Sequence, residues 1–552
     1  MDLFTMGYTV LGGLGIFFFG MKSMSEALQS AAGDVIKRAI DTITKHRIYS
    51  VMVGVVVTMI VQSSSVTTVM VVGFVNAGLM NLTQAIGVIF GANIGTTVTG
   101  WIISIKVGKY GLLFIALGIF PLLFGKSHRT RQIGKVLFGV GMIFYGLKIM
   151  SGAFKPLRSM PEFLEMISYF SEPHYGAYAA CILVGCILTM VIQSSSAMLG
   201  ITIAMAASGA ISFQTAAALV LGENIGTTIT ALLASVGANI TAKRAARAHA
   251  IFNLLGVLVI FLIFPYYVEL IDWIVPGDPN FISPSGDKPN IAVHIATGHS
   301  IFNVTATLLF LPFLYKLANF VTRITPDKGN KQQHHLVVLG DPKDLIPATA
   351  FAQAEAELTK MKDVVDRAYE LTGKLLRQKS ELSPEDALIK IRDYEQITDN
   401  IQKEITIFLV KLCENSLTSE ESNLAQSIMR EADELESVAD YLERLAKYST
   451  RTPLHEVLTE ESKEEFLSFY DEVEKFYSGI TKRIKSTEQM DLTIVHRKSE
   501  ELRQKAQLIR KNQLVRVSNG NSDPLTTLTF SDMVVAVRKI RSHAQNIAEA
   551  HI

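Results

Sequence analysis

Residues 58–65 read TMIVQSSS, and residues 189–196 read TMVIQSSS, 131 positions further along the chain. An ungapped alignment that extends both stretches to 42 positions gives 15 identities. The identities include a second motif, which reads GANIGTT at 91–97 and GENIGTT at 222–228. Two polar motifs that recur at one offset without a gap indicate an internal duplication of this part of the chain.

Both copies lie in a strongly apolar region. Residues 1–325 carry 20 Lys or Arg and 12 Asp or Glu, so about 10% of them are charged, against roughly 25% in a soluble domain. This composition excludes a single soluble enzyme and a disordered chain, and it predicts an all-α, polytopic protein embedded in a lipid bilayer. A helix needs about 20 apolar residues to cross a bilayer core of about 30 Å. Apolar runs that meet this requirement lie at about 8–28, 84–105, 133–152, 212–236, 248–271 and 292–318.

The two QSSS tetrads interrupt two further apolar runs, at 50–80 and 177–210. Non-helical backbone at membrane depth survives only where it lines a cavity in the protein. We therefore expect two re-entrant hairpins, each with a polar tetrad near its tip. Three crossings then separate the two copies of the second motif, and an odd number inverts the second copy relative to the first. Inverted repeats, here about 20–105 and 146–236, are the plan of secondary transporters, whose substrates bind near the bilayer midplane.

Basic residues in short loops indicate which side of the membrane is inside the cell. With two hairpins counted, the basic loops predict an outside N-terminus and an inside C-terminal region, in a chain without a cleavable signal peptide. The acidic, proline-rich loop 272–290 lies outside in this arrangement, whereas Lys106 and Lys109 fall on an outside turn and disagree with it. The inside loops carry Lys37, Arg38, Lys45 and Arg47; Lys126, Arg129, Arg131 and Lys135; and Lys243, Arg244 and Arg247.

The tetrads supply neutral hydrogen-bonding groups without a nearby Lys or Arg. Hydroxyl and amide groups can donate to the oxygens of a small anion, and a helix that begins after the break adds free backbone N–H groups and a positive dipole end. Such a site would bind a small oxyanion weakly and reversibly. The candidate substrate-binding residues are Gln62, Ser63, Ser64, Ser65, Gln193, Ser194, Ser195 and Ser196.

The second motif supplies oxygen atoms that suit a small cation. Amide and hydroxyl oxygens beside glycines fit sodium, as in other transporters with broken helices, and the one embedded carboxylate, Glu223, replaces Ala92 of the first copy. An intramembrane acid is a functional candidate, although a pairing role for Glu223 stays open. Two later H-x-x-F-N segments, at 249–253 and 299–303, favour helix packing over a gating or cation-binding role. The sodium-binding candidates are Asn93, Thr96, Thr97, Asn224, Thr227, Thr228 and Glu223.

These features resemble the type II sodium–phosphate cotransporter family in its bacterial form. Family members carry two QSSS tetrads on inverted repeats, each followed by G-x-N-I-G-T-[ST], and then helices with H-x-x-F-N. The resemblance covers about residues 5–320, and it implies that the two tetrads meet to hold phosphate and sodium. Glu223 departs from the small or neutral residue expected there, which leaves the number and identity of coupled ions open.

The rest of the chain has a different composition. Residues 326–346 are polar, with Pro and Gly, and are predicted to form a linker. Residues 347–552 are helical in pattern, and the acidic balance of the chain beyond residue 325, net −7, disfavours nucleic acid. They resemble the PhoU family, which has two three-helix bundles and regulates phosphate transport. Its E-x-x-x-D metal motifs imply divalent or iron ions at Glu395, Asp399, Glu436 and Asp440, although such pairs are common on charged helices.

The sequence therefore predicts a non-enzymatic protein of the inner membrane. We expect sodium-coupled transport of inorganic phosphate by alternating access, regulated by a cytoplasmic PhoU-like domain at 347–552. Phosphate export, another oxyanion, and a phosphate sensor that signals through the helical domain stay open as alternatives. A homodimer and a cytoplasmic regulatory partner are left open as well.

Overall fold

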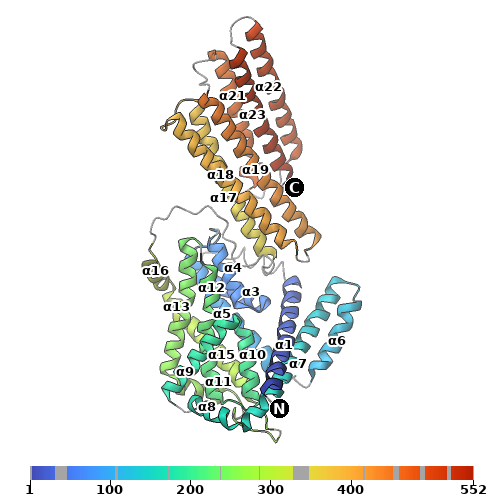
Figure 1. The fold of residues 1–552 in the computed structure, drawn as a ribbon, viewed down its shortest axis with the longest axis vertical. Coiled ribbons are helices and arrows are strands. Elements are labelled where there is room, and N and C mark those ends of the chain that lie inside the picture. The colour runs from blue at the N-terminus through green and yellow to red at the C-terminus, as the bar shows by residue number, and fades with distance from the viewer. Residues whose placement is uncertain are drawn as a thin grey trace. The chain divides into compact units, whose positions relative to one another are not determined.

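The computed structural model forms two compact units, Met1–Asn330 and Lys331–Ile552 (Figure 1). Lys37, Arg38, Lys45, Lys106, Lys109 and all but the first residue of the predicted linker lie outside the described residues. The structure describes residues 3–31, 47–76, 78–105, 110–171, 174–236, 238–284, 286–326, 347–414, 417–451, 459–484, 491–518 and 524–550.

The expected fold class is confirmed, because every regular element in the described residues is a helix and seven helical segments are long and apolar enough to cross a membrane. These segments are Phe4–Ala31, Leu82–Ser104, Arg129–Ser159, Tyr175–Ile192, Phe213–Ala234, Ile240–Leu262 and Ile291–Ile324. The elements of the first unit are α1 (Leu3–Ala31), α3 (Arg47–Val61), α4 (Ser64–Asn76), α5 (Leu82–Ser104), α6 (Gly111–Phe124), α7 (His128–Phe154), η2 (Lys155–Ser159), α8 (Pro161–Ser171), α9 (Tyr175–Ile192), α10 (Ser195–Ala207), α11 (Phe213–Gly226), α12 (Thr228–Ala234), α13 (Ile240–Leu262), α14 (Phe264–Ile274), α15 (Ile291–Phe310), η3 (Leu311–Phe313) and α16 (Leu314–Ile324).

One predicted apolar run, 248–271, is two helices rather than one. Helix α13 ends at Leu262, and α14 begins at Phe264, directly before Pro265. Proline lacks a backbone N–H and is accommodated in the first turn of a helix, where that group has no intrahelical partner. The hydropathy of the run is continuous, but the proline divides it.

Both QSSS tetrads break a helix at the same point. The chain leaves helical geometry at Gln62, between α3 and α4, and at Gln193, between α9 and α10. Both glutamines have the left-handed backbone conformation, with φ of 57° and 56°, which is uncommon for a residue with a side chain and costs free energy. The interruption predicted at the tetrads is present, whereas the re-entrant path of each pair across a bilayer stays a prediction.

The two copies pack through equivalent residues. In the first copy, a Cβ atom added to Gly54 of α3 would lie 2.1 Å from the carbonyl oxygen of Val88 in α5. In the second copy, a Cβ on Gly185 of α9 would lie 2.2 Å from the carbonyl oxygen of Leu219 in α11. Each member of the second pair follows its counterpart by 131 positions, and only glycine fits at either approach. The orientation of the copies in a bilayer stays a prediction.

The described part of the second unit contains six long helices. α17, α18 and α19 pack against one another, α21, α22 and α23 do the same, and the two groups meet along α19 and α23. One continuous apolar core includes residues of all six, among them Phe408, Leu442 and Phe466. The helices are α17 (Pro347–Leu376), α18 (Pro384–Leu412), α19 (Ser419–Arg451), α21 (Glu460–Ile484), α22 (Leu492–Ser518) and α23 (Pro524–Ala550).

Candidate functional site

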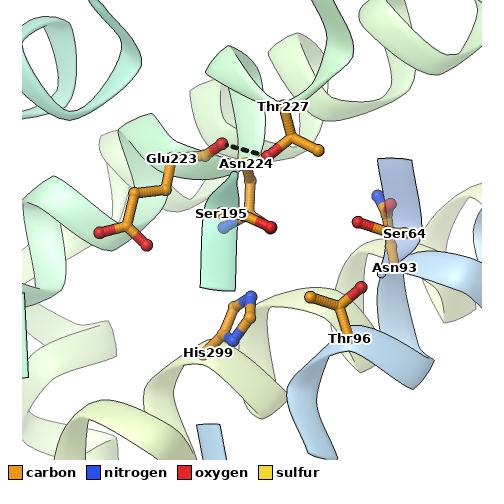
Figure 2. A pocket seen from close by; sticks show the side chains of 8 residues that line it. All are labelled: Ser64, Asn93, Thr96, Ser195, Glu223, Asn224, Thr227 and His299. Atoms are coloured by element: carbon orange, nitrogen blue, oxygen red, sulfur yellow. Dashed lines mark hydrogen bonds between the residues drawn. The ribbon is translucent and has the colours of Figure 1, made fainter. Parts of the chain in front are cut away.

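A small polar cavity in the first unit is lined by residues from both copies of the duplication (Figure 2). Its volume is about 10 Å³, which is room for about one water molecule. The first copy contributes Ser64, Asn93 and Thr96, the second contributes Ser195, Glu223, Asn224 and Thr227, and α15 contributes His299.

Each tetrad uses its serines for different purposes. The hydroxyl oxygens of Ser63 and Ser194 accept hydrogen bonds of 3.3 Å from the backbone N–H groups of Val66 and Ala197. These bonds satisfy backbone donors at the starts of α4 and α10, which is the role of a helix N-cap. The second serine of each tetrad, Ser64 or Ser195, is the one that lines the cavity.

The remaining tetrad residues do not line the cavity. The amide of Gln62 is engaged within the protein, because its Oε1 accepts a 3.1 Å hydrogen bond from Thr99 and its Nε2 donates to the carbonyl oxygen of Met59. The carbonyl oxygen of Ser65 accepts a 3.1 Å bond from the Thr68 hydroxyl. The other predicted residues that lie off the cavity are Gln193 and Ser196.

The threonines and asparagines of the second motif divide in the same way. The Thr96 and Thr227 hydroxyls line the cavity and donate to carbonyl oxygens of their own helices, at 3.0 and 2.9 Å. The amide nitrogens of Asn93 and Asn224 also donate within the protein, at 2.9 and 2.8 Å. Because these hydrogens are engaged within the protein, the oxygens of the four residues keep lone pairs as acceptors, which suits a cation.

The next threonine of each motif lies off the cavity. Thr97 and Thr228 donate to the carbonyl oxygens of Ile94 and Ile225, both at 2.8 Å. A helical threonine commonly makes this local bond. The structure thus brings together four of the six neutral sodium-binding candidates and leaves this pair apart.

Glu223 is the acidic residue of the cavity. Its side chain is 2% exposed, and its Oε1 accepts a 2.8 Å hydrogen bond from the Thr202 hydroxyl of α10. A buried carboxylate is costly unless a cation or a proton balances its charge. Because the first copy has Ala92 at the equivalent position, the cavity has its acid on one side only.

His299 belongs to the cavity, although its sequence motif favoured a packing role. The imidazole extends from α15 toward the cavity, below Ser195 and to the left of Thr96 in Figure 2. The motif itself gave the only available signal, since H-x-x-F-N occurs twice, but it could not distinguish His299 from His249. The other H-x-x-F-N segment, 249–253, contacts the site indirectly, because Asn253 accepts the hydrogen bond of Asn93.

The acidic residues predicted to bind metal in the second unit face one another across α18 and α19. Burial and the neighbouring Asp399 raise the pKa of Glu395, and burial and the neighbouring Asp440 raise the pKa of Glu436. However, Asp399 pairs with Lys403 at 2.7 Å, and Asp440 with Arg444 at 2.8 Å. In the described part of the chain, no three His, Cys, Asp or Glu residues are arranged to hold a metal. The geometry does not support the predicted divalent or iron site.

Fold and site together define a class of protein. A multi-pass helical membrane protein whose polar cavity lies between two copies of a broken-helix unit has the architecture of a secondary transporter. The chain belongs to the Na+/Pi-cotransporter family, whose model matches residues 16–152 and 174–269. The matched ranges contain both tetrads and both copies of the second motif, whereas His299 lies beyond them.

Individual relatives agree with this family. The "Uncharacterized protein YqeW" of Bacillus subtilis is 32% identical over 319 residues, which are 56% of this chain and 96% of that protein. The "Putative inorganic phosphate export protein YjbB" of Salmonella typhimurium is 27% identical over 423 residues, 76% of this chain and 74% of its own. The "Sodium-dependent phosphate transport protein 2A" of Rattus norvegicus is 38% identical over 100 residues, 17% of this chain and 15% of its own. No solved structure matches the chain.

Proposed function

We propose that this protein transports inorganic phosphate across the inner membrane, coupled to sodium, by alternating access between the two copies. The observation that carries the proposal is the meeting of Ser64 and Ser195 in one cavity. These serines come from equivalent positions of the duplicated motif, at the starts of α4 and α10. A site shared by two halves can be exposed to either side when the halves exchange conformation.

The side chains of the cavity suit an anion and a cation together. The Ser64 and Ser195 hydroxyls can donate to phosphate oxygens, while the oxygens of Thr96, Thr227 and the two asparagines can bind sodium. Sodium also accounts for the energetics of uptake. An anion that enters a negative cell moves against about 2.3 kcal/mol per charge for each 100 mV, which co-transported cations offset.

A cavity of about 10 Å³ has room for about one water molecule, so phosphate binding requires the lining groups to separate. Movement of α4 against α10 would enlarge it, because each helix begins at a break. Gln62 and Gln193, whose backbone is in the left-handed conformation, are the points at which α4 and α10 can turn relative to α3 and α9. Opening on alternate sides follows if the two breaks turn at different stages of the cycle.

Uptake of labelled phosphate by proteoliposomes tests the function directly. The purified full chain is reconstituted, and uptake is measured under an inward sodium gradient, an equal potassium gradient, and no gradient. We expect sodium-driven accumulation above equilibrium. Equal uptake under all three conditions, or no uptake beyond that of protein-free liposomes, would contradict sodium-coupled transport.

Phosphate export is the second candidate, because the relative named for inorganic phosphate export matches over 423 residues. That match is longer than the 330-residue first unit, so it reaches into the second unit as well. Vesicles loaded with labelled phosphate, with sodium inside or outside, distinguish the two directions. Net efflux of labelled phosphate from the loaded vesicles, together with no accumulation in the uptake assay, would favour export over uptake.

We further propose that the second unit is a cytoplasmic, PhoU-like regulator. The support is its six-helix composition and the sequence resemblance. Removal of residues 345–552 should preserve transport and remove its dependence on phosphate supply in cells. A truncated chain that folds but no longer binds phosphate would move the binding site to the second unit, and it would favour the sensor over the transporter.

A further inference from the structure

His299 lines the cavity with a buried imidazole, and one nitrogen of this ring has no hydrogen-bond partner within the protein. The side chain is 4% exposed, and its Nδ1 has no partner within the protein. A buried donor or acceptor without a partner costs free energy, which a hydrogen bond to a bound ligand would recover. In Figure 2 the ring lies below Ser195 and to the left of Thr96.

The other groups of the cavity are poor in free donors. The Thr96 and Thr227 hydroxyl protons are used in their own helices, and the amides of Asn93 and Asn224 each donate elsewhere once. Ser64 and Ser195 remain as hydroxyl donors, and each asparagine keeps one further amide N–H, whereas phosphate presents four oxygens. An N–H from the imidazole of His299 would add a further side-chain donor, from outside the duplication, to this anion-binding set.

An unpartnered nitrogen alone does not identify a binding residue, and His249 shows why. It occupies the same position of the other H-x-x-F-N segment, it is fully buried, and neither of its ring nitrogens has a hydrogen-bond partner. His249 does not line the cavity, whereas His299 does. The two histidines share a motif and are both buried, so the feature that distinguishes His299 from His249 is its position at the cavity.

We propose that His299 binds the transported oxyanion directly, by donating a hydrogen bond from its imidazole to a phosphate oxygen. This inference rests on the proposed phosphate transport and adds a binding residue from outside both copies of the duplication. Glu223 shares the cavity with His299, and the Tyr267 hydroxyl donates a 2.7 Å hydrogen bond to the carbonyl oxygen of Gly298, the residue before His299. Neither is placed to supply the same donor, because one is a carboxylate and the other donates to the backbone.

Equilibrium binding of labelled inorganic phosphate to the purified full chain, at several sodium concentrations, tests the proposal independently of transport direction. His299→Leu removes the donor, and His299→Asn retains an amide donor near the position of Nδ1. We expect His299→Leu to weaken phosphate affinity roughly tenfold to a hundredfold, the effect of one hydrogen bond to a charged group. We expect His299→Asn to remain within about threefold of the parent, because the hydrogen bond is preserved.

His249→Leu is the matched control, since it deletes an equally buried imidazole of the same motif, and its phosphate affinity should stay within about threefold of the parent. If His299→Leu does not fold, His299→Phe replaces it, because phenylalanine retains a ring and lacks the donor. Parent affinity in the donor-free variant would overturn the proposal, and so would a change in sodium dependence without a change in phosphate affinity. A parent chain that binds no phosphate would instead refute the proposed function, so the two failures are distinguishable.

Discussion

Asn93 of α5 donates a 2.9 Å hydrogen bond to the Oδ1 of Asn253 in α13, and both side chains are buried. The bond links a cavity-lining residue of the first copy to a helix outside the duplication. On the other side of the cavity, Asn224 donates to the carbonyl oxygen of Val220 in its own helix, and the Oδ1 of Asn303 in α15 has no partner. The two equivalent asparagines of the duplication are therefore supported differently.

Replacement of Asn253 by leucine should destabilise the first unit. The change leaves the Asn93 amide buried without its partner, which costs about 1–3 kcal/mol of the free energy of unfolding. Thermal unfolding of the detergent-solubilised full chain measures the loss. Asn303→Leu is the control, because both asparagines donate to a carbonyl oxygen one turn earlier and only Asn253 also bonds across helices. Equal destabilisation by the two substitutions would contradict this account.

The duplication and the helix breaks were predictable because they depend on local sequence. QSSS at an offset of 131 marks both breaks, and glycines such as Gly54 and Gly185 permit the close helix packing around them. The division of labour within each tetrad was not predictable. A serine that caps a helix and a serine that lines a cavity are identical in sequence, and only the direction of the chain after Gln62 or Gln193 separates them.

The contribution of α15 was also hidden from the sequence. His249 and His299 each begin an H-x-x-F-N segment, so the local sequence pattern does not distinguish them. Which of the two reaches the cavity depends on how α13 packs against α5 and α11, and on how α15 packs against α5, α10 and α11. This packing is a long-range property of the fold. Residues of this kind become visible only when distant helices are placed together.

The serines of each tetrad should separate binding from stability. Ser64→Ala and Ser195→Ala each remove a cavity donor, and we expect either change to weaken phosphate affinity about tenfold with a small effect on unfolding. Ser63→Ala and Ser194→Ala remove N-caps instead, and should lower the free energy of unfolding by about 1 kcal/mol with a smaller effect on affinity. Phosphate titrations and thermal melts of the four variants provide the comparison. The reverse pattern would mean that the first serine, not the second, holds the ligand.

Glu223 should govern the response to cations. Glu223→Gln keeps the size of the side chain and its acceptor for Thr202, but it removes the negative charge that a cation or proton balances. We expect a sodium activation curve shifted to higher concentration, with phosphate affinity at saturating sodium changed less. Glu165→Gln, on the exposed face of α8, is the charge-matched control and should leave the curve unchanged. An unaltered sodium curve in Glu223→Gln would assign the carboxylate a packing role.

The second unit should become more open to exchange as the pH rises toward neutrality, because of Glu431 in α19. Its side chain is 7% exposed, and burial together with Glu355 raises its pKa to about 7, against the opposing effect of Lys362. A raised pKa in the folded state means that the protonated acid favours folding. The contribution is complete below the unfolded pKa of about 4.5 and is lost as the pH rises through about 7.

This contribution to the free energy of unfolding is at most about 3 to 4 kcal/mol, from roughly 1.4 kcal/mol per pKa unit. Hydrogen exchange of the α19 backbone, measured between pH 5.5 and 8 and corrected for the intrinsic exchange rate, should show decreasing protection in the parent. Glu431→Gln, which is neutral throughout, should remove most of this trend and protect α19 more than the parent does at pH 8. Glu420→Gln, in the exposed first turn of the same helix, should follow the parent. If Glu431→Gln retains the full pH trend, the trend cannot come from the Glu431 carboxylate, and another group must titrate.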